Sequence, residues 1–261
     1  MEWIISDVHG CFYTLQALLA EIRQRDPDPK FIFIGDYCDR GKNSAKVVDF
    51  LVNWIKEKPD ELVCLRGNHD DVIDWLLTEH CKGRPSEWVA GKPTIVKVFK
   101  WWLNCGLDTT LESYGILDPR RTCVPPVEDP VEEWREKVPE SHVKFFQNLK
   151  MFWENDTHFA CHGYFDPQQQ LPRDMRFVKS DKYEEILWCR FDPSPSYAWD
   201  KIGVFGHTPV LQPVKHDKRR MIDTACFMGR SLTAYCCRTD EFLSVVADER
   251  DIVEEWKQNE K

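Results

Sequence analysis

Five clusters of polar residues each stand directly after a short apolar run of the chain, at residues 6–10, 35–41, 66–70, 161–163 and 206–209. The side chains in them that suit metal binding are Asp7, His9, Asp36, Asn68, His162 and His207. This set of oxygen and imidazole donors contains no thiolate. It is too large for one tetrahedral zinc ion and suits two divalent ions that share a bridging carboxylate. The spacing therefore predicts a two-metal site.

Two divalent ions held about 3.5–4 Å apart promote in-line displacement at phosphorus, because they acidify a shared water and neutralise the phosphoryl oxygens. The remaining polar residues of the clusters fit that chemistry. His69, beside Asn68, is placed to protonate the leaving oxygen as a general acid, and Asp39 is suited to hold that imidazole in the right tautomer. Arg40 and Arg66 supply planar donors that match phosphate oxygens.

The alternative interpretation is that single Asp and His residues at strand ends are caps and turn formers. For any one cluster that interpretation is the better one. Five clusters with compatible chemistry, each after an apolar run, favour a common site.

The elements that must position these clusters alternate in the manner of a layered α/β fold. Short apolar runs at 3–5, 31–34 and 62–65 predict strands. Between them, leucine and isoleucine recur with helical spacing over 15–22, and a second helix is expected from Ser44 to Pro59. Ligands bind outside the carboxyl ends of strands in such sheets, which is where the polar clusters stand.

The rest of the chain is expected to follow the same plan. The predicted elements are helices over 71–115 with a break at 82–93, a helix over 141–149, a strand ending at 161, a loop over 167–182, and short strands at 203–205, 220–222, 231–237 and 242–246. Residues 118–139 hold five Pro and many charges, which indicates a loop or cap insertion. We expect one domain over 1–247 and a charged, solvated C-terminal tail over 248–261.

Composition narrows the class of protein. The chain has 261 residues, a formal charge of −9 and 13% aromatic residues, which excludes a disordered chain. The negative charge argues against stable nucleic-acid binding, and the basic run at 215–220 is expected to be a solvated loop. No apolar run is long enough to span a membrane. Eleven cysteines without CxxC spacing, and no signal peptide, favour a cytoplasmic location with free thiols.

The motifs as a whole resemble the PPP family of metallophosphatases, specifically the bacterial and bacteriophage branch of its serine/threonine protein phosphatases. The family pattern GDxHG…GDxVDRG…GNHE…H…GHT is matched at residues 6–10, 35–41 and 67–70, at His162, and at residues 206–208. Three segments outside this pattern are also similar to that branch: residues 102–106 with the trailing 111–115, residues 187–190, and residues 221–225.

The resemblance implies a role for each matched residue. It implies Asp7, His9 and Asp36 on a first metal, Asp36, Asn68, His162 and His207 on a second, His69 as the acid with Asp39 as its partner, and Arg40, Arg66 and Arg190 on the phosphate. It also implies a calcineurin-like metallophosphoesterase fold with a central β-sandwich flanked by helices. Manganese is the usual activating ion of that branch, with Fe, Zn, Ni or Co as alternatives.

The function that this resemblance favours is hydrolysis of phosphoserine and phosphothreonine in a phosphoprotein or phosphopeptide, by in-line attack of metal-bound hydroxide. The main alternative is a symmetrical dinucleoside tetraphosphatase acting on a dinucleoside polyphosphate, because Asp70 replaces the Glu of GNHE and GNHD is common there. A nuclease is disfavoured, because Pro209 stands where a metal-binding His would be needed. A non-catalytic scaffold is the minor alternative, although no ligand has been lost.

Overall fold

Two five-stranded sheets form the centre of the computed structural model, which describes residues 1–78, 94–119, 129–165, 186–193 and 199–257. The first sheet has the strand order β10(Glu241–Val246), β9(Ser231–Cys236), β1(Glu2–Ile5), β2(Lys30–Phe33), β3(Leu62–Cys64). The second has the order β4(Phe152–Glu154), β5(His158–Cys161), β6(Ile202–Phe205), β8(Arg219–Met221), β7(Val214–His216). The pairs β1–β2, β2–β3, β5–β6 and β6–β8 are parallel.

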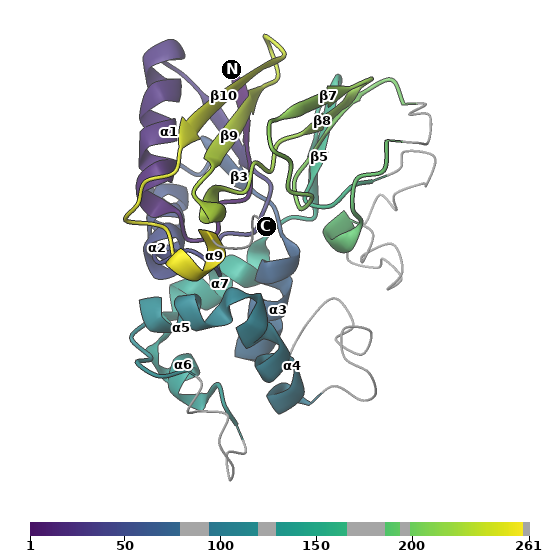
Figure 1. Ribbon diagram of the computed structural model, residues 1–261. Helices are drawn as coiled ribbons and strands as arrows, with labels where there is room; N and C mark the ends of the chain where they lie inside the picture. Colours follow the sequence, from purple (N-terminus) through teal and green to yellow (C-terminus); the bar gives the residue numbers. More distant parts are fainter. Residues whose placement is uncertain (79–93, 120–128, 166–185, 194–198, 258–261) are drawn as a thin grey trace.

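The two sheets pack face to face, and the alternation of side chains along the strands explains the packing (Figure 1). Ile4 of β1 and Ile32 of β2 point into a core that also contains Val204 of β6. Their neighbours Trp3 and Ile5 point the other way, into the core beneath the helices. Because successive residues of a strand face opposite sides, the apolar runs 3–5 of β1 and 31–33 of β2 are buried on both faces. The predicted α/β fold, a β-sandwich flanked by helices, is confirmed.

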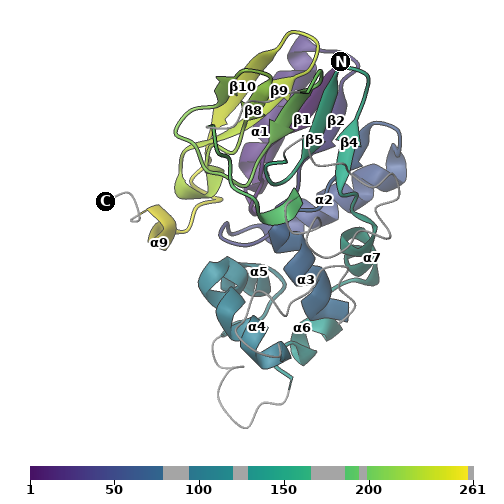
Figure 2. The same cartoon turned by 90° about the vertical axis from the view of Figure 1, so that its right-hand side faces the viewer.

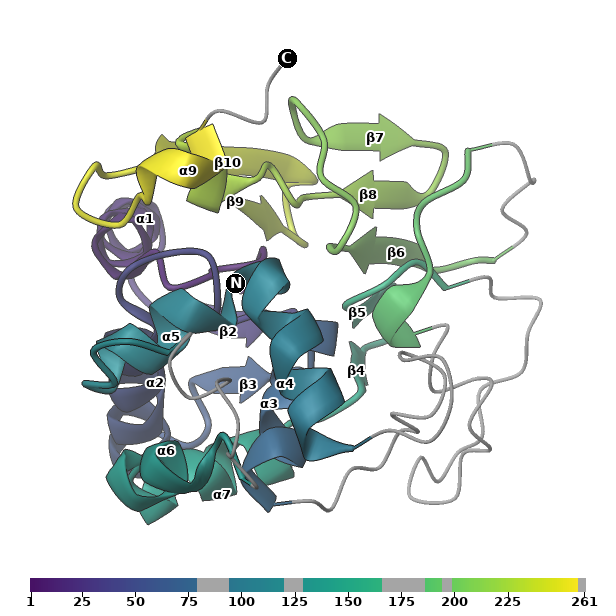
Figure 3. The ribbon, with the colours of Figure 1, turned by 60° about the horizontal axis from the view of Figure 1, so that its bottom comes forward.

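Helices cover the outer face of the first sheet and gather at one end of the sandwich (Figures 1 and 2). They are α1(Phe12–Arg25), α2(Ser44–Glu57), α3(Asn68–Thr78), α4(Ile95–Trp102), α5(Asp108–Ser113), α6(Glu132–Lys137), α7(Glu140–Asn148) and α9(Glu254–Lys257), with a π-helical turn η1(Leu103–Leu107) and a 3-10 turn η4(Cys226–Met228). Seen from below, α3 to α7 lie together at the edge where β1, β2 and β3 end (Figure 3). None of the described helices is long and apolar enough to cross a bilayer.

Two expected loops contain regular structure. Within 118–139, residues 132–137 form α6, whose Trp134 is 1% exposed in the main core; residues 120–128 lie outside the described part. The basic run at 215–220 is not a solvated loop, because it forms most of the β7–β8 hairpin. Arg219 and Arg220 are buried there, paired with Asp217 and Asp240. Arginine pairing with acids in and beside the hairpin permits burial that charge alone would oppose. The expected loop at 167–182 and the break at 82–93 lie outside the described residues.

The C-terminal segment is not wholly a solvated tail. Asp251 is 0% exposed, and its carboxylate accepts hydrogen bonds from the amides of Tyr13 and Thr14 at 3.1 and 2.8 Å and from the Thr14 hydroxyl at 2.8 Å. These amides belong to the first turn of α1, which has no side-chain cap of its own at Cys11. Asp251 therefore caps α1 from the far end of the chain. We propose that residues 1–247 form one domain and that residues 248–257 dock on it.

We expect Asp251→Ala to lower the free energy of unfolding by about 2–3 kcal/mol, because it leaves buried amide donors unpaired and removes an anion from a helix N-terminus. Urea denaturation measures this. Asp248→Ala is the control, since its partly exposed carboxylate pairs with the exposed Arg250 and its loss should cost less than about 1 kcal/mol. Equal losses in the two variants would contradict the capping role.

Candidate active site

The six residues predicted as metal ligands lie just past the carboxyl ends of parallel strands, along one edge of the sandwich. Asp7 and His9 follow β1, Asp36 follows β2, Asn68 follows β3, His162 follows β5 and His207 follows β6. Five of them are buried and His207 is half-buried. Residues separated by up to 200 positions in the chain thus share one site.

The carboxylate of Asp36 lies at the centre of this site. Its Oδ2 atom is 3.3 Å from Nε2 of His9 and 3.5 Å from Nε2 of His162. Asp36 is common to two groups of donor atoms that all lie within 4.8 Å of one another: one with His9 and His69, the other with His162 and His207. A carboxylate shared by two donor groups is the arrangement that a bridging ligand requires.

The imidazoles of His9 and His162 point unprotonated nitrogens into the site. Nδ1 of His9 donates to the carbonyl of Cys38 at 2.8 Å, and Nδ1 of His162 donates to the carbonyl of Ile34 at 3.1 Å. In a neutral ring the other nitrogen then carries a lone pair. Nε2 of His162 faces Oδ1 of Asn68 at 2.8 Å. Two acceptors directed at one another this closely fit a cation that takes both lone pairs.

Asp7 is oriented toward the second donor group. Its Oδ2 atom accepts a hydrogen bond from the amide of His207 at 3.1 Å and lies 3.8 Å from Nδ1 of His162. The expected first set was Asp7, His9 and Asp36, whereas the donor group around His9 contains His69 in place of Asp7. The side chains thus place Asp7 in the site and leave its pairing with His9 a prediction.

The electrostatics of the site favour a bound cation. Burial and the neighbouring Asp223 raise the pKa of Asp7 well above its usual value, and burial together with Asp7 raises the pKa of Asp36. Burial also lowers the pKa of His9 and His162, so these rings are neutral at pH 7. The charge of Arg40 offsets the rise in the pKa of the two carboxyls only in part, and the donor atoms of the crowded carboxylates and neutral imidazoles fit divalent ions of the manganese, iron or zinc type.

Two glycines allow the carboxylates to enter the site. A Cβ atom at residue 67 would collide with the carboxylate of Asp36, and one at residue 206 would collide with that of Asp7. Gly67 follows β3 and Gly206 follows β6, and each makes room for a ligand that follows another strand, Asp36 after β2 and Asp7 after β1. This is a close-approach requirement.

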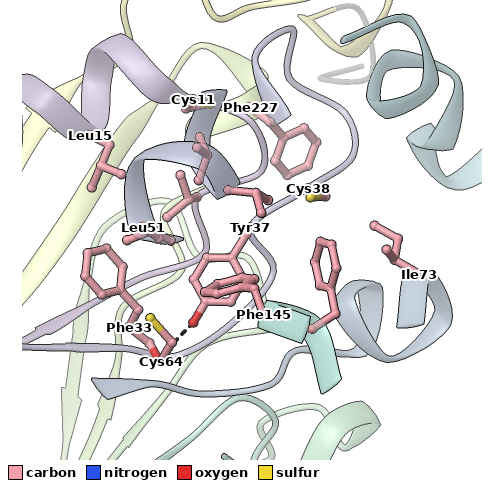
Figure 4. Close-up of a cluster of buried hydrophobic side chains, with 14 of the residues drawn as sticks. Cys11, Leu15, Phe33, Tyr37, Cys38, Leu51, Cys64, Ile73, Phe145 and Phe227 are labelled. Atoms are coloured by element: carbon pink, nitrogen blue, oxygen red, sulfur yellow. Dashed lines mark hydrogen bonds between the residues drawn. The ribbon is translucent and has the colours of Figure 1, made fainter. Parts of the chain in front are cut away.

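The loop that carries Asp36 is fixed from below by Tyr37 and Asp70. Tyr37 is fully buried and packs against Phe145 at 5.2 Å between ring centres (Figure 4). Its hydroxyl donates to the carbonyl of Leu65 at 2.8 Å. The carboxylate of Asp70 accepts from the amides of Asp36 and Tyr37 at 2.7 and 3.1 Å. Asp70 therefore fixes the backbone of the loop by these two hydrogen bonds. This is the role of the Asp side chain at the position where the family pattern has Glu.

His69 and Asp39 form a hydrogen-bonded pair beside the donor groups. Nδ1 of His69 donates to Oδ2 of Asp39 at 2.7 Å. Burial raises the pKa of Asp39 to about 7, opposed by hydrogen bonds from Thr110 and Trp102. The bond fixes the His69 ring so that its Nε2 atom faces the site, 4.0 Å from Asp36. The geometry thus suits proton transfer at Nε2 of His69.

The guanidinium of Arg40 lies at the mouth of the site. It donates to Nε2 of His9 at 2.8 Å and to Nε2 of His69 at 2.9 Å, and its centre stacks 4.5 Å over the ring of Phe227. The first of these contacts uses a lone pair that a metal would also need, so a metal and Arg40 cannot hold that nitrogen together. A metal on His9 would free this edge of the guanidinium for a phosphate oxygen.

Arg66 is the exception among the predicted phosphate contacts, and the prediction for it is wrong. The side chain is 0% exposed, and its guanidinium donates to Asp71 and Asp74 of α3 at 2.9 Å each, and to the carbonyl of Phe146. A buried guanidinium engaged by two carboxylates is a structural tie between β3, α3 and α7. The planar donors are present, but they face the core.

Arg190 is exposed. Burial of the His207 ring, and next the nearby positive charge of Arg190, lower the pKa of His207 to about 4. The amide of Phe191 donates to the Thr208 hydroxyl at 2.9 Å, which ties the segment of Arg190 to the loop of His207.

Asp223 was not predicted as a site residue. It is 2% exposed and its charge acts on Asp7. The signal was available, because Asp223 directly follows the apolar pair Met221 and Ile222, as the other polar clusters follow their strands.

Comparison with known proteins gives consistent results. The family model described as calcineurin-like phosphoesterase matches residues 3–211. The chain is 25% identical to an asymmetrical bis(5'-nucleosyl)-tetraphosphatase PrpE from Oceanobacillus iheyensis, over 97% of this chain and 95% of the relative. It is 24% identical to a protein of the same name from Anoxybacillus flavithermus, over 97% of both chains.

Solved structures show the same fold at low sequence identity. A provisionally named diadenosine tetraphosphatase is similar with a TM-score of 0.57 and 16% identity, over 95% of this chain and 94% of that one. A protein serine/threonine phosphatase from Saccharomyces cerevisiae is similar with a TM-score of 0.51 and 14% identity, over 95% of this chain and 80% of that one. At these identities the likeness concerns the fold alone.

Proposed function

The chain belongs to the calcineurin-like phosphoesterase family, and on that premise we propose that it hydrolyses phosphate esters at a site for two divalent metal ions. The observation that carries the proposal is the Asp36 carboxylate, which is common to two donor groups and lies 4.0 Å from Nε2 of His69. Asp36 would be the carboxylate that two metal ions share, and His69 the adjacent general acid; metal-assisted phosphoryl hydrolysis uses both groups.

The proposed ligands are those that the sequence predicted. Asp7, His9 and Asp36 would hold one ion, and Asp36, Asn68, His162 and His207 the other, with manganese as the proposed metal. The bound ions would supply charge neutralisation at the phosphoryl oxygens and an acidified water for in-line attack. The lone pairs that converge at Asn68 and His162 support the second set most directly.

The protein groups around the ions orient the substrate and move the proton. Arg40 and the exposed Arg190 are the proposed phosphate contacts, one on each side of the donor groups. His69 would donate a proton from Nε2 to the departing oxygen, while Asp39 accepts the hydrogen bond from Nδ1 and fixes the orientation of the ring.

The first substrate that we propose is phosphoserine or phosphothreonine in a protein. An alkoxide leaving group is strongly basic and needs a proton in the transition state, which a held general acid supplies. A nucleotide leaving group is a phosphate and needs the proton much less. The short bond between His69 and Asp39 therefore favours an alkyl phosphate monoester.

Dinucleoside tetraphosphates are the second candidate substrate. The relatives from Oceanobacillus and Anoxybacillus carry that activity in their names and match almost the whole chain. The rings of Trp101 and Trp188 also stack with centres 6.4 Å apart and planes 21° apart, and Trp188 lies 6.2 Å from the ring of His207. Aromatic faces beside the proposed metal site suit a nucleobase, for which stacking contributes about 1–3 kcal/mol.

The test compares a phosphoserine peptide with diadenosine tetraphosphate at equal concentration, with manganese and then with a chelator. Faster, chelator-sensitive turnover of the peptide supports the first candidate. Faster turnover of the dinucleotide, reduced in Trp101→Ala with the peptide rate unchanged, supports the second. If neither substrate reacts with manganese present, the proposed function is wrong and the scaffold hypothesis returns.

We also propose a cytoplasmic location. Every cysteine in the described part of the chain is a free thiol, and most are buried. Unpaired thiols in this number suit a reducing compartment.

A further inference from the structure

A helical segment to which the sequence assigned no catalytic role lies against the loop of Asp39 and Arg40. It runs from the end of α4 through η1 into α5. Trp102 ends α4, Thr110 lies in α5, and Gly106 stands at the kink between the two helices, with a φ of 104°. Each of the three contacts Asp39 or Arg40.

Both oxygens of the Asp39 carboxylate are engaged by this segment. Oδ1 accepts the hydroxyl of Thr110 at 2.6 Å, and Oδ2 accepts the indole nitrogen of Trp102 at 2.7 Å. The only other described donor to these oxygens is Nδ1 of His69, at 2.7 Å on Oδ2. The carboxylate therefore cannot rotate without breaking a bond to the segment. Trp102 also packs on the ring of His69, with centres 4.6 Å apart.

The segment holds the backbone of the loop as well. Asp39 and Arg40 both have a φ of 70°, an uncommon conformation for residues other than glycine. The amide of Asp39 donates to the Thr110 hydroxyl at 2.8 Å, and the amide of Arg40 donates to the carbonyl of Gly106 at 3.1 Å. Strained backbone of this kind persists only where its surroundings fix it.

Gly106 is required for this contact. Its φ of 104° disfavours other residues, and a Cβ atom there would lie 2.6 Å from the amide nitrogen of Arg40 and 2.8 Å from its Cγ. Any side chain at position 106 would push the segment away from the loop. Trp102, Gly106 and Thr110 thus form one surface fitted to Asp39 and Arg40.

We propose that Trp102, Gly106 and Thr110 are positioning residues, which hold the Asp39–His69 pair for proton donation and Arg40 at the phosphate. The proposal rests on the proposed function, because it assigns work to the same site. None of the three needs to touch the substrate. They act through Asp39 and Arg40.

The test replaces Thr110 and measures two substrates that differ in their need for an acid. With manganese present, Thr110→Val should lower kcat for a phosphoserine peptide by about 10–100-fold, the usual loss for a removed supporting hydrogen bond. The loss for p-nitrophenyl phosphate should be several-fold smaller, since its leaving group needs little protonation. Thr110→Ser, which keeps the hydroxyl, should restore most of the peptide rate. Trp102→Phe should repeat the Val pattern.

Ser113→Ala is the matched control, because it removes a half-buried hydroxyl from the same segment that bonds only to Thr110 O and the Ala45 amide among the described residues. It should change the ratio of the two rates by less than about 3-fold. Equal losses on both substrates in Thr110→Val, or a Ser variant as slow as the Val variant, would overturn the positioning role.

A proton NMR measurement separates this inference from the proposed function. The His69 Nδ1 proton should resonate far downfield, identified by its loss in His69→Asn. It should shift in Thr110→Val and Trp102→Phe and stay in place in Ser113→Ala. An unmoved signal overturns the inference, whatever the activity. A shifted signal in a protein that hydrolyses neither monoester supports the positioning surface while the proposed function fails.

Discussion

Asp36→Asn is expected to abolish metal-dependent turnover. Replacement of a residue that hydrogen-bonds a metal ligand typically lowers metal affinity or activity by about 10–100-fold. Replacement of a ligand shared by two ions should therefore lower the rate by more than about 100-fold. The amide can keep the hydrogen bond that Oδ1 of Asp36 accepts from the amide of His69 at 3.0 Å. The change therefore removes charge and metal affinity with little change of shape. Initial rates and metal content by plasma mass spectrometry measure the effect.

Thermal unfolding provides an independent readout of the same variant. Burial and Asp7 raise the pKa of Asp36, so its charged form is unfavourable in the metal-free fold. Metal-free Asp36→Asn should therefore be no less stable than the wild type above the usual Asp pKa. Manganese at 100 times its dissociation constant should stabilise the wild type by about 2.7 kcal/mol, and the variant far less.

Asp60→Asn is the control for charge, since Asp60 is an exposed carboxylate between α2 and β3. It should keep wild-type metal content, stability gain and rate. If Asp36→Asn binds two manganese ions per chain and is stabilised by them like the wild type, Asp36 does not bridge.

The positions of the ligands could be predicted from the sequence because the rule behind them is local. An apolar run that becomes a strand, followed at once by Asp, Asn or His, places that side chain at the end of the strand, and parallel strands bring such ends together. Asp7, Asp36 and His207 obey this rule. Asp223 obeys it too, although the resemblance of its segment, residues 221–225, assigned it no role.

Arg66 shows the limit of the same reasoning. It also follows a strand, and its planar donors suit phosphate, yet two acids of α3 take them up. Asp71 and Asp74 stand three residues apart and face one side of that helix, a spacing visible in the sequence. What the sequence did not show is that this side faces β3 and the core. The partner of a buried charge depends on packing between elements, which local spacing does not determine.

Contacts across the whole chain were beyond prediction for a related reason. Asp251 caps α1 at Thr14, 237 residues away in the sequence. The residues that flank Asp251 in the sequence are mostly charged, and this pattern does not predict a buried side chain. The sequence predicted a strand at 220–222, which overlaps β8, but it predicted a solvated loop for the basic run at 215–220, whose charges hide the alternation of a strand. In both cases a pairing partner, Thr14 or Asp240, decides the burial of a charge.

His69→Asn is expected to slow hydrolysis of a phosphoserine peptide by about 10²–10⁴-fold, the usual contribution of a general acid. For p-nitrophenyl phosphate the loss should be at least 10-fold smaller than that, because the aryl oxide departs without a proton. His216→Asn, on β7 away from the site, is the matched control and should leave both rates unchanged.

The metal content of His69→Asn decides between two roles for this residue. His69 lies in one donor group with His9 and Asp36, so its geometry also permits metal binding. As an acid, it can be replaced without loss of manganese. As a ligand, its loss should remove about one ion per chain and slow both substrates equally. Equal slowing with lost metal would move His69 from the acid role to the first metal site.

Asp39→Asn extends the argument from His69 to the pair. If Asp39 acts only by holding Nδ1 of His69 through their 2.7 Å hydrogen bond, its effect must vanish once the imidazole is gone. Residues that act as a unit are strongly non-additive. The double variant should then hydrolyse the phosphoserine peptide no more slowly than His69→Asn alone. If the two losses multiply instead, Asp39 acts on the reaction by a route other than His69.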